Sequence, residues 1–361
     1  MLEVDASPLV TLIRQRIERA GGWLPFDQFM AMALYEPGLG YYANASPKFG
    51  LMPEGGSDFV TAPELSPLFG QALARQVAQA LDCSASAAVW EFGAGTGALA
   101  EHLLDALGER AASYTIVDVS ESLRARQAQR LARFGDKVQW ASRLPEQMTG
   151  VVVGNEVLDA MPVQLLHWDG SQWFERGVGA TSLGLAWIDR PTPLRPPLEG
   201  VFVPGSVIEI HRQAEAFVRT LGAHLSRGAV FLLDYGFPEA EFYHPQRLGG
   251  TLMCHRAHRS DMDPLSDVGQ KDITAHINFT GIAVAAQEAG LEVLGYTSQG
   301  RFLLNCGLLD MMADADYRAI SNAQKLLAEH EMGELFKVIA LSRGIELDAL
   351  GFAQGDRTHR L

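Results

Sequence analysis

A strand-like segment that runs into a glycine-rich turn constrains the fold of this chain more than any other feature. Residues 88–92 (AVWEF) have strand character, glycines alternate at positions 93, 95 and 97, and residues 98–103 (ALAEHL) have helical character. This order predicts a strand, a tight turn and a helix. Glycines let a backbone approach a ligand closely, and a helix start presents free N–H groups at the positive end of its dipole. The segment therefore predicts a binding site for a small polar cofactor. The simpler alternative is a turn that only packs a helix against a sheet.

The spacing of the glycines favours one class of cofactor over another. Dinucleotide-binding turns follow G-x-G-x-x-G, whereas Gly93, Gly95 and Gly97 follow G-x-G-x-G. S-adenosylmethionine has no pyrophosphate to cradle, and its ammonium group suits a carboxylate such as Glu91, two residues before the turn. We therefore predict an S-adenosylmethionine site with contacts to Glu91 and to the three glycines.

The next two predicted strands offer residues for the nucleoside half of this cofactor. Residues 114–118 (YTIVD) are apolar or β-branched and end in Asp118, at the place where α/β sheets bind ribose hydroxyls. Asp118 can instead cap the following helix, although Ser120 is better placed for that role. Trp140, in the predicted strand 137–142, is the candidate for contact with adenine, and otherwise it belongs to the core.

A polar group follows the fourth predicted strand at residues 150–154. Asn155, Glu156 and Asp159 come after this strand, and the carboxyl ends of central strands face the ligand crevice of an open α/β sheet. Carboxylates suit a cationic acceptor such as a guanidinium, which presents its N–H donors in a planar fork. We predict that these three residues are catalytic. The alternative is that Asn155 and Glu156 cap the short helix that follows.

A second polar cluster faces the same crevice. Asp234 ends the predicted strand 229–234, and Asp272, His276 and Asn278 precede a later predicted helix. We predict catalytic roles for Asp234 and His276, because such residues suit the positioning of an acceptor or the removal of its proton. Ordinary helix capping explains the later group equally well. Nearby histidines have neither a helix nor a cysteine pair to hold them together, so we expect no metal site.

The order of predicted elements indicates one α/β fold with additions. Strands and helices alternate from residue 88 onward, which predicts a doubly wound, mostly parallel sheet. We expect four parts: a helical cap with a cofactor-covering loop at 1–85, a cofactor-binding core at 86–162 and 205–361, an inserted hairpin lobe at 163–204, and an active-site insertion at 236–275.

The composition excludes several other classes of protein. The 361 residues are 47% hydrophobic, which is enough for a sizeable core, and the net charge of −14 argues against a nucleic-acid partner and suits a cationic substrate. No apolar run approaches the roughly 18 residues of a membrane span, and the acidic start (MLEVD) is unlike a signal or transit peptide. We expect a cytoplasmic protein without a membrane partner. The three separated cysteines indicate neither a disulfide framework nor a zinc site.

Five motifs together resemble the MidA family of class I S-adenosylmethionine-dependent methyltransferases. They are GSDFVTAPE at 56–64, EFGAGTG at 91–97, GNEVLDAMPV at 154–163, DYG at 234–236 and DITAHINF at 272–279. The resemblance extends over most of the chain and is more specific than the glycine turn alone.

The resemblance implies a Rossmann-like core whose last strand is antiparallel, and it implies cofactor contacts at Asn155 and Glu156 as well as at the glycine turn and Asp118. The loop with Thr61, Pro63 and Glu64 would fold over the methionine end. Eukaryotic members are mitochondrial complex I assembly factors that methylate an arginine of a complex I subunit, so the implied partner is a protein with an accessible arginine. The alternative function is a binding or assembly factor that holds the cofactor structurally and docks a partner. The sequence leaves open whether the chain forms a homodimer.

Overall fold

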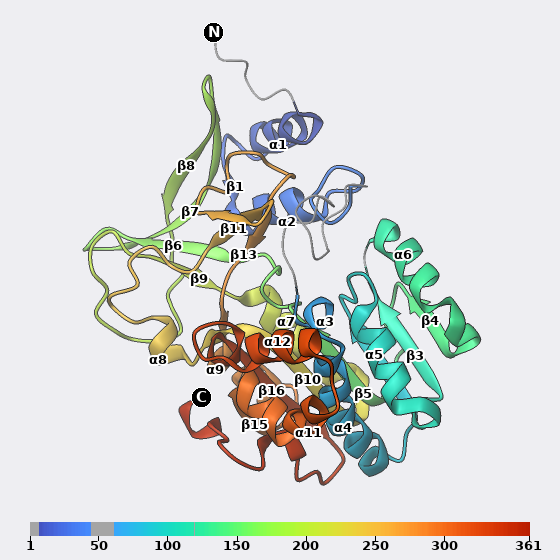
Figure 1. Cartoon of the computed structure of the whole chain (residues 1–361). Coiled ribbons are helices and arrows are strands. Elements are labelled where there is room, and N and C mark those ends of the chain that lie inside the picture. Colours follow the sequence, from blue (N-terminus) through green and yellow to red (C-terminus); the bar gives the residue numbers. More distant parts are fainter. Residues whose placement is uncertain (1–6, 45–60, 119) are drawn as a thin grey trace.

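The structure, a computed structural model, describes residues 7–44, 61–118 and 120–361 of the chain (Figure 1). Its largest sheet consists of β2 (Ala88–Phe92), β3 (Ser113–Val117), β4 (Val138–Ala141), β5 (Met148–Asn155), β10 (Leu225–Phe237), β15 (Glu292–Ser298) and β16 (Phe336–Arg343), with the short β14 (Ile277–Asn278) paired to β10. The strands lie in the order β15-β16-β10-β5-β2-β3-β4.

The pairing of these strands confirms the predicted α/β fold. The pairs β10–β5, β5–β2, β2–β3 and β3–β4 are parallel, whereas β16 is antiparallel to both β10 and β15. The chain winds outward from β2 through β3 to β4 and then returns to β5 on the other side of β2. Open α/β sheets bind ligands at such a switch point, outside the carboxyl ends of the strands.

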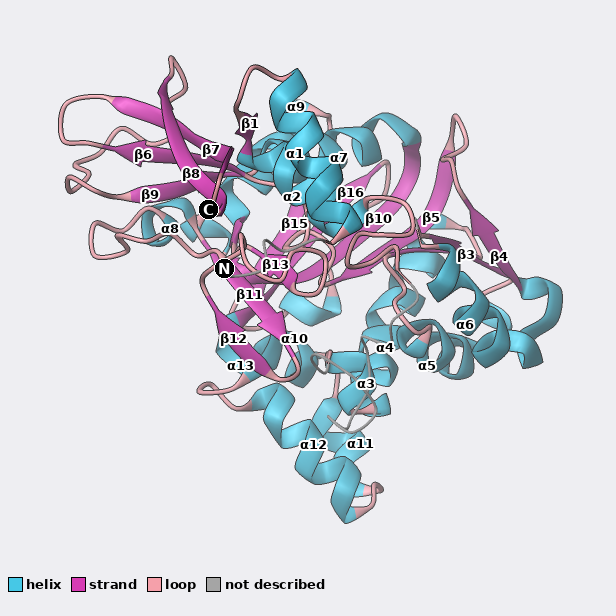
Figure 2. Cartoon of the chain, turned by 90° about the horizontal axis from the view of Figure 1, so that it is seen from above, coloured by secondary structure: helices cyan, strands magenta, loops and turns pink. Residues whose placement is uncertain are grey.

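Alternating side chains bury an apolar layer on each face of this sheet. In β5, Val151 and Val153 face one layer and Val152 faces the other, as expected for a strand covered on both sides. The first layer is covered by α4 (Pro67–Ser84), α5 (Ala98–Leu107), α6 (Glu121–Leu131), α10 (Gln299–Asn305), α11 (Leu308–Ala313), α12 (Tyr317–Leu327) and α13 (Met332–Leu335). The second layer is covered by α7 (Arg212–His224) and α9 (Phe279–Glu288), on the opposite side of the sheet in Figure 2.

A second, antiparallel sheet lies beside the core. Its strands are β1 (Leu24–Pro25), β6 (Gln164–Trp168), β7 (Trp173–Thr181), β8 (Gly184–Pro191) and β9 (Val207–Ile210). The predicted lobe at 163–204 supplies β6, β7 and β8, while β1 and β9 join the same sheet from outside that range. Strands β1 and β9 belong to this sheet because their backbones pair with β7 and β6, which are distant from them in the sequence.

The N-terminal helices connect this second sheet to a third one. Helices α1 (Pro8–Arg19) and α2 (Phe26–Tyr35) share an apolar cluster with residues of β6 and β7 and with Cys254 and Ile273. The last two residues belong to the sheet β12-β11-β13, formed by β11 (Met253–Arg256), β12 (Arg259–Asp261) and β13 (Asp272–Thr274). The predicted insertion at 236–275 therefore packs against the N-terminal helices.

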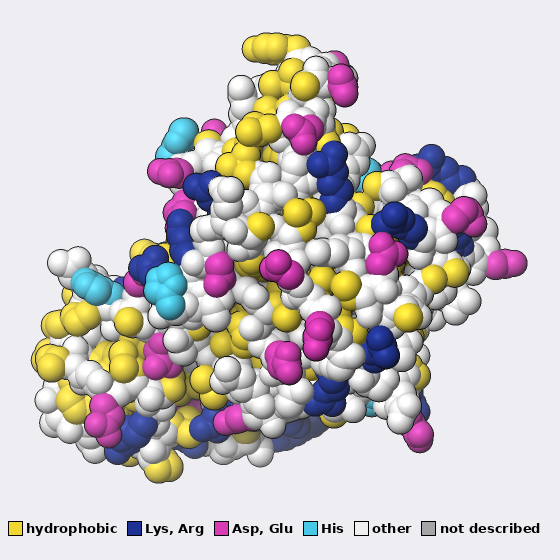
Figure 3. All heavy atoms as spheres, turned by 90° about the horizontal axis from the view of Figure 1, so that it is seen from below, with side chains coloured by type: hydrophobic (Ala, Val, Ile, Leu, Met, Phe, Trp, Pro, Cys, Tyr) yellow, Lys and Arg dark blue, Asp and Glu magenta, His cyan; other side chains and the backbone are white. Residues whose placement is uncertain are grey.

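The remaining described elements are short. They are α3 (Ala62–Leu65), α8 (Glu239–Phe242) and 3-10 helices at Gly108–Arg110, Ala132–Lys137, Leu350–Phe352 and Thr358–Arg360. Among the described helices, none combines the length and apolar character that a bilayer crossing requires. Acidic and basic side chains are interspersed over the face shown in Figure 3.

Candidate active site

A cavity of about 1130 Å³ lies at the carboxyl ends of β2, β3, β5 and β10. The core contributes one side of its wall through the glycine turn and the ends of these strands. The other side comes from α2 and the turn after it, from β11 and β13, and from residue His276. The cavity therefore lies between the sheet and the additional elements that pack beside it.

The glycine turn forms a cradle at one end of the cavity. Gly93 and Gly95 line the cavity with φ values of +62° and +53°, a region that side chains rarely adopt. A Cβ atom at Gly93 would lie 3.0 Å from Cγ2 of Val157. Gly97, with φ +84°, is not among the described residues that line the cavity, and a Cβ atom there would meet Leu131 and Gln127 instead. Two of the three predicted glycines thus border the cavity, and the third packs α5 against α6.

Glu91 lies at the end of β2 and borders the cavity with a carboxylate that is only 2% exposed. It accepts a hydrogen bond from Tyr114 Oη at 2.7 Å. Burial raises the pKa of Glu91 to about 8; Asp118 adds to this increase and the Tyr114 hydroxyl opposes it. A cationic group in the cavity would favour the ionised carboxylate.

Asp118 borders the cavity from the end of β3, and its carboxylate is held by two donors. The backbone N–H of Ser120 donates to Oδ1 at 2.9 Å, and Nε2 of Gln127 donates to Oδ2 at 2.8 Å. Ser120 itself is the N-cap of α6, with its hydroxyl accepting from Leu123 N at 3.4 Å. The sequence left open whether Asp118 is the cap, and the structure assigns that role to Ser120.

Trp140 is placed behind Asp118. It is not among the described residues that line the cavity, and its indole Nε1 donates to Oε1 of Gln127 at 2.9 Å. Gln127 in turn donates to Asp118 and to the carbonyl of Gly95 at 2.9 Å. Gln127 thus connects the two cofactor-side segments, and sequence reasoning missed it because a glutamine in an amphipathic helix has no distinguishing pattern.

The segment before α4 also reaches the cavity. Thr61, Pro63 and Glu64 line it, whereas residues 56–60 of the same motif lie outside the described residues. Glu64 pairs with Arg130 of α6 at 3.1 Å and accepts a hydrogen bond from Thr96 of the glycine turn. These contacts fix the segment against the glycine turn.

Asn155 ends β5, Glu156 and Asp159 follow it, and all three line the cavity. Glu156 has φ +52°, unusual for a residue other than glycine, and Nδ2 of Asn155 donates to its Oε1 at 2.9 Å. Burial raises the pKa of Glu156 to about 8, and the nearby Asp159 carboxylate adds to the increase. Burial likewise raises the pKa of Asp159 to about 6, opposed by the hydroxyl of Tyr235, which donates to Oδ2 at 2.6 Å.

Asp234 and His276 differ in their relation to the cavity. Asp234 is buried outside the described cavity wall and accepts hydrogen bonds from the backbone of Leu158 at 2.9 Å and Asp159 at 3.2 Å. It therefore orders the loop that carries Asp159. His276 lines the cavity with its ring edge-to-face against Tyr235 at 4.9 Å, and burial lowers the pKa of its imidazole to about 4.

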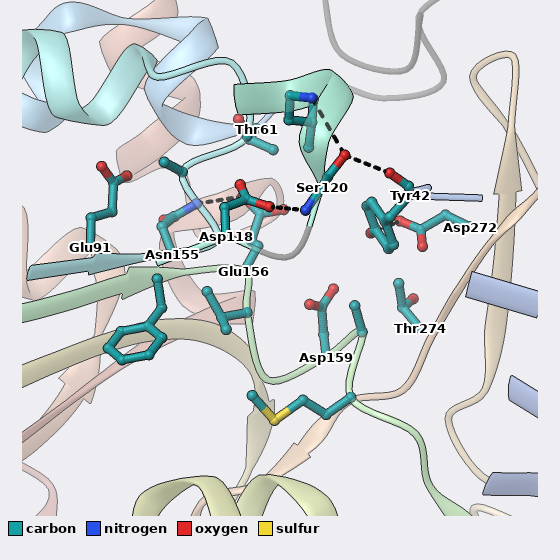
Figure 4. A pocket seen from close by; sticks show the side chains of 18 of the residues that line it. Tyr42, Thr61, Glu91, Asp118, Ser120, Asn155, Glu156, Asp159, Asp272 and Thr274 are labelled. Carbon is teal, nitrogen blue, oxygen red and sulfur yellow. Dashed lines mark hydrogen bonds between the residues drawn. The ribbon is translucent and has the colours of Figure 1, made fainter. Parts of the chain in front are cut away.

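The structure adds two tyrosines to the wall beside Asp272. Tyr35 and Tyr42 line the cavity and their rings stack at 5.6 Å, and Figure 4 shows Asp272 next to Tyr42. The sequence had offered Asp272, together with His276 and Asn278, as a residue that could position the acceptor or take its proton, whereas the tyrosines precede the first recognised motif. Aromatic residues in a predicted helical cap suggest core packing, so no sequence pattern distinguishes these two tyrosines from residues of the core.

The charges around the cavity have one sign. The lining carboxylates are Glu64, Glu91, Asp118, Glu156, Asp159 and Asp272. No lysine or arginine lines the cavity among the residues that the structure describes. Within the same described residues, no three His, Cys, Asp or Glu side chains form a group suited to a metal ion. The wall is suited to ligands that carry positive charge.

Comparisons with known proteins agree with this geometry. The sequence model of the S-adenosyl-L-methionine-dependent methyltransferase family Methyltransf_28 matches residues 71–297, more than half of the chain. A crystal structure of a COG1565 superfamily protein from Burkholderia thailandensis bound to S-adenosyl-homocysteine is similar with a TM-score of 0.94 and 50% identity, covering 98% of this chain and 96% of that one. A native crystal structure of a COG1565 superfamily protein from the same organism has a TM-score of 0.89 and 49% identity, with the same coverage.

More distant relatives have a named activity. The mitochondrial protein arginine methyltransferase NDUFAF7 homolog of Drosophila melanogaster is 26% identical over 375 residues, which covers 90% of this chain and 82% of that protein. The mitochondrial protein arginine methyltransferase NDUFAF7 of Danio rerio is 25% identical over 368 residues, covering 89% and 84%. From the family match, the ligand-bound structural neighbour and the motifs that resemble MidA, we conclude that the chain belongs to this MidA-like, Methyltransf_28 family of S-adenosylmethionine-dependent methyltransferases.

Proposed function

We propose that this methyltransferase transfers a methyl group to a guanidinium nitrogen of an arginine in a protein substrate. The observation that carries the proposal is the cavity wall, in which several buried carboxylates face an interior that no described lysine or arginine lines. A bound cation favours the ionised form of buried carboxylates, and a guanidinium stays protonated and offers five donors. The names of the relatives in Drosophila melanogaster and Danio rerio support the same acceptor.

The residues on the core side fit the cofactor. S-adenosylmethionine, when bound, supplies an electrophilic methyl group on a sulfonium. Gly93 and Gly95 leave room for close backbone approach, and a Cβ at Gly93 would already crowd Val157. Glu91 would receive the ammonium group, since Tyr114 is the one hydrogen-bond donor to that buried carboxylate among the described residues. Asp118, oriented by Gln127 and the Ser120 backbone, would hold the ribose hydroxyls.

The residues after β5 would orient the acceptor. Methyl transfer is an in-line displacement: a nitrogen lone pair would form the new N–C bond while the methyl–sulfur bond of the sulfonium breaks and its electron pair stays on sulfur. The neutral thioether S-adenosyl-homocysteine would be the leaving group, and the methylated nitrogen would then lose a proton. The enzyme's main contribution is alignment. Asp159 is buried and Glu156 is partly buried beside the cavity, and Oδ1 of Asp159 has no hydrogen-bond partner among the described residues. Such an oxygen suits an N–H of a bound guanidinium. His276 lines the same cavity, and its neutral imidazole would be available to accept the proton.

The decisive experiment identifies the product. Purified protein is incubated with methyl-labelled S-adenosylmethionine and lysate of the source cells, and the labelled protein is analysed by mass spectrometry after digestion. We expect methylarginine in one or a few proteins. Label on another residue type or only in small molecules would contradict the proposal, and binding of cofactor without any transfer would favour the assembly-factor alternative.

A further inference from the structure

The short strand β13 brings a carboxylate into the cavity that the proposed mechanism does not use. Asp272 and Thr274 line the cavity, while Ile273 between them points into the apolar cluster of α1 and α2. This alternation is the period of two of a β-strand. Asp272 is only 2% exposed, and Figure 4 shows it across the cavity from the residues that follow β5.

A tyrosine from the N-terminal part of the chain holds this carboxylate. The hydroxyl of Tyr42 donates to Oδ2 of Asp272 at 2.8 Å. The ring of Tyr42 stacks on Tyr35 with an interplanar angle of 17°, and the hydroxyl of Tyr35 donates to the carbonyl of Ala160 at 2.8 Å. Both rings therefore have a fixed orientation and form an aromatic wall beside Asp272.

Asp159 has a matching arrangement from different elements. The hydroxyl of Tyr235 in β10 donates to Oδ2 of Asp159 at 2.6 Å. Each of the two carboxylates is thus fixed by a tyrosine hydroxyl on its Oδ2 atom, and each borders the cavity. Both also act on Glu156, whose carboxyl they make harder to ionise. The two fixed carboxylates therefore border the same interior, a geometry that suits the N–H donors of a planar cation.

We propose that Asp272 binds the acceptor guanidinium together with Asp159, and that Tyr42 is the residue that positions Asp272. The inference rests on the proposed function, since it names the second carboxylate of that acceptor site. The stacked rings of Tyr35 and Tyr42 provide a surface for the flat guanidinium, an arrangement that favours arginine over the compact ammonium of lysine.

The same tyrosine connects the acceptor side to the cofactor side. The hydroxyl of Ser120 donates to the backbone carbonyl of Tyr42 at 2.8 Å, and the backbone N–H of Ser120 donates to Asp118. Figure 4 shows this chain of hydrogen bonds from Asp118 through Ser120 to Tyr42, and Tyr42 continues it to Asp272. These hydrogen bonds therefore connect Asp272, the proposed acceptor carboxylate, with Asp118, which we assign to the ribose.

The test compares Asp272→Asn and Tyr42→Phe with matched controls. Tyr243→Phe removes another buried tyrosine hydroxyl, one that donates to the backbone carbonyl of Glu209. Asp267→Asn removes a half-exposed carboxylate of the same insertion, which pairs with Arg256. Initial rates of methyl transfer to lysate protein are measured over a dilution series of the lysate, and affinity for S-adenosyl-homocysteine is measured by calorimetry.

We expect Asp272→Asn to lower transfer by about 100-fold and Tyr42→Phe to raise the apparent KM for the acceptor about tenfold with little change in maximal rate. All four variants should bind S-adenosyl-homocysteine within about threefold of wild type, because none of the changed groups is assigned to the cofactor. Both controls should transfer at the wild-type rate.

Two results would overturn the inference. One is an Asp272→Asn variant that transfers at the wild-type rate; the other is loss of cofactor affinity and of melting temperature together, which would make Asp272 a structural residue. If the wild-type product contains no methylarginine, the proposed function fails first. If it does contain methylarginine and Asp272→Asn is unaffected, only the inference fails.

Discussion

The two halves of the cavity are built in different ways. The cofactor half comes from adjacent segments: β2, the glycine turn and β3 lie within residues 88–118. The acceptor half combines Tyr42, Asp159, Tyr235 and Asp272, which come from four separate parts of the chain. Hydrogen bonds of the first half link neighbouring segments, whereas the Tyr42–Asp272 bond spans 230 positions.

This difference separates what binds the cofactor from what selects the acceptor. A continuous strand–turn–helix unit can bind the same cofactor in any protein that contains it. The acceptor half depends on the N-terminal helices and on the insertion with β11, β12 and β13, which pack together in one apolar cluster. We therefore expect specificity for the acceptor to reside in the elements that surround the core.

The largest effect is expected from breaking the cofactor half. Gly95→Val places a β-branched side chain at φ +53°, on the cavity wall, so binding of S-adenosyl-homocysteine and methyl transfer should both be lost. Calorimetry measures the binding. Gly249→Val is the control, because a Cβ there has nothing within 4 Å. If Gly95→Val binds S-adenosyl-homocysteine with unchanged affinity, the glycine turn is not part of the cofactor site.

Breaking the acceptor half should separate transfer from binding. Glu156→Gln keeps a hydrogen-bonding partner for Asn155 but removes the charge that would orient a guanidinium. We expect transfer to lysate protein to fall by about 100-fold or more, while cofactor affinity stays within a few-fold. A large loss of affinity would instead assign Glu156 to the cofactor half, and wild-type transfer would exclude a charge-based acceptor site.

Sequence reasoning predicted the core and the cofactor half more completely than the acceptor half, for a physical reason. The alternation of strands and helices predicted the mostly parallel α/β sheet, and the motifs that resemble MidA implied the antiparallel last strand and the family; the structure and the comparisons confirm these three predictions. Among the predicted contacts, Gly93, Gly95 and Asp118 border the cavity. Their individual roles stay predictions until the variants are measured.

Three predicted residues do not border the cavity. Gly97 and Trp140 are not among the described residues that line it; a Cβ atom at Gly97 would meet Leu131 and Gln127, and the Trp140 indole donates to Gln127. Asp234 ends the right strand and supports the backbone at Asp159. Tyr42 could not be predicted, because its partner Asp272 is brought to it only by the packing of distant elements.

A smaller effect should sharpen the assignment of the ribose contact. Asp118→Ala removes an acceptor for a charged hydrogen bond and should weaken binding of S-adenosyl-homocysteine by about 1.5–3 kcal/mol without unfolding the protein. Calorimetry and a melting curve are compared with those of Asp136→Ala, an exposed carboxylate of the same domain. A lower melting temperature with unchanged affinity would make Asp118 a structural residue that orders Ser120 and Gln127.

The smallest effect concerns the pH dependence of stability, to which each half contributes one glutamate. Burial raises the pKa values of both Glu91 and Glu156 to about 8, from an ordinary value of 4.5. Between these values the folded protein holds protons that the unfolded chain releases. The contribution of these two glutamates to stability is therefore greatest at low pH within this window, and it decreases as the pH rises towards 8.

Melting curves between pH 5.5 and 8.5 compare wild type with Glu91→Gln and Glu156→Gln. In the absence of ligand, the glutamates should lower the melting temperature of wild type as the pH rises from about 5.5 to 8.5. Each substitution should make this fall in melting temperature smaller by about 2 °C. Saturation with S-adenosyl-homocysteine should separate the two halves, because its ammonium group would keep Glu91 ionised and leave Glu156 as before. With ligand bound, Glu91→Gln should leave the change of melting temperature with pH as it is in wild type, while Glu156→Gln should still reduce that change. Equal effects of the two substitutions with ligand bound would mean that the ammonium group does not meet Glu91.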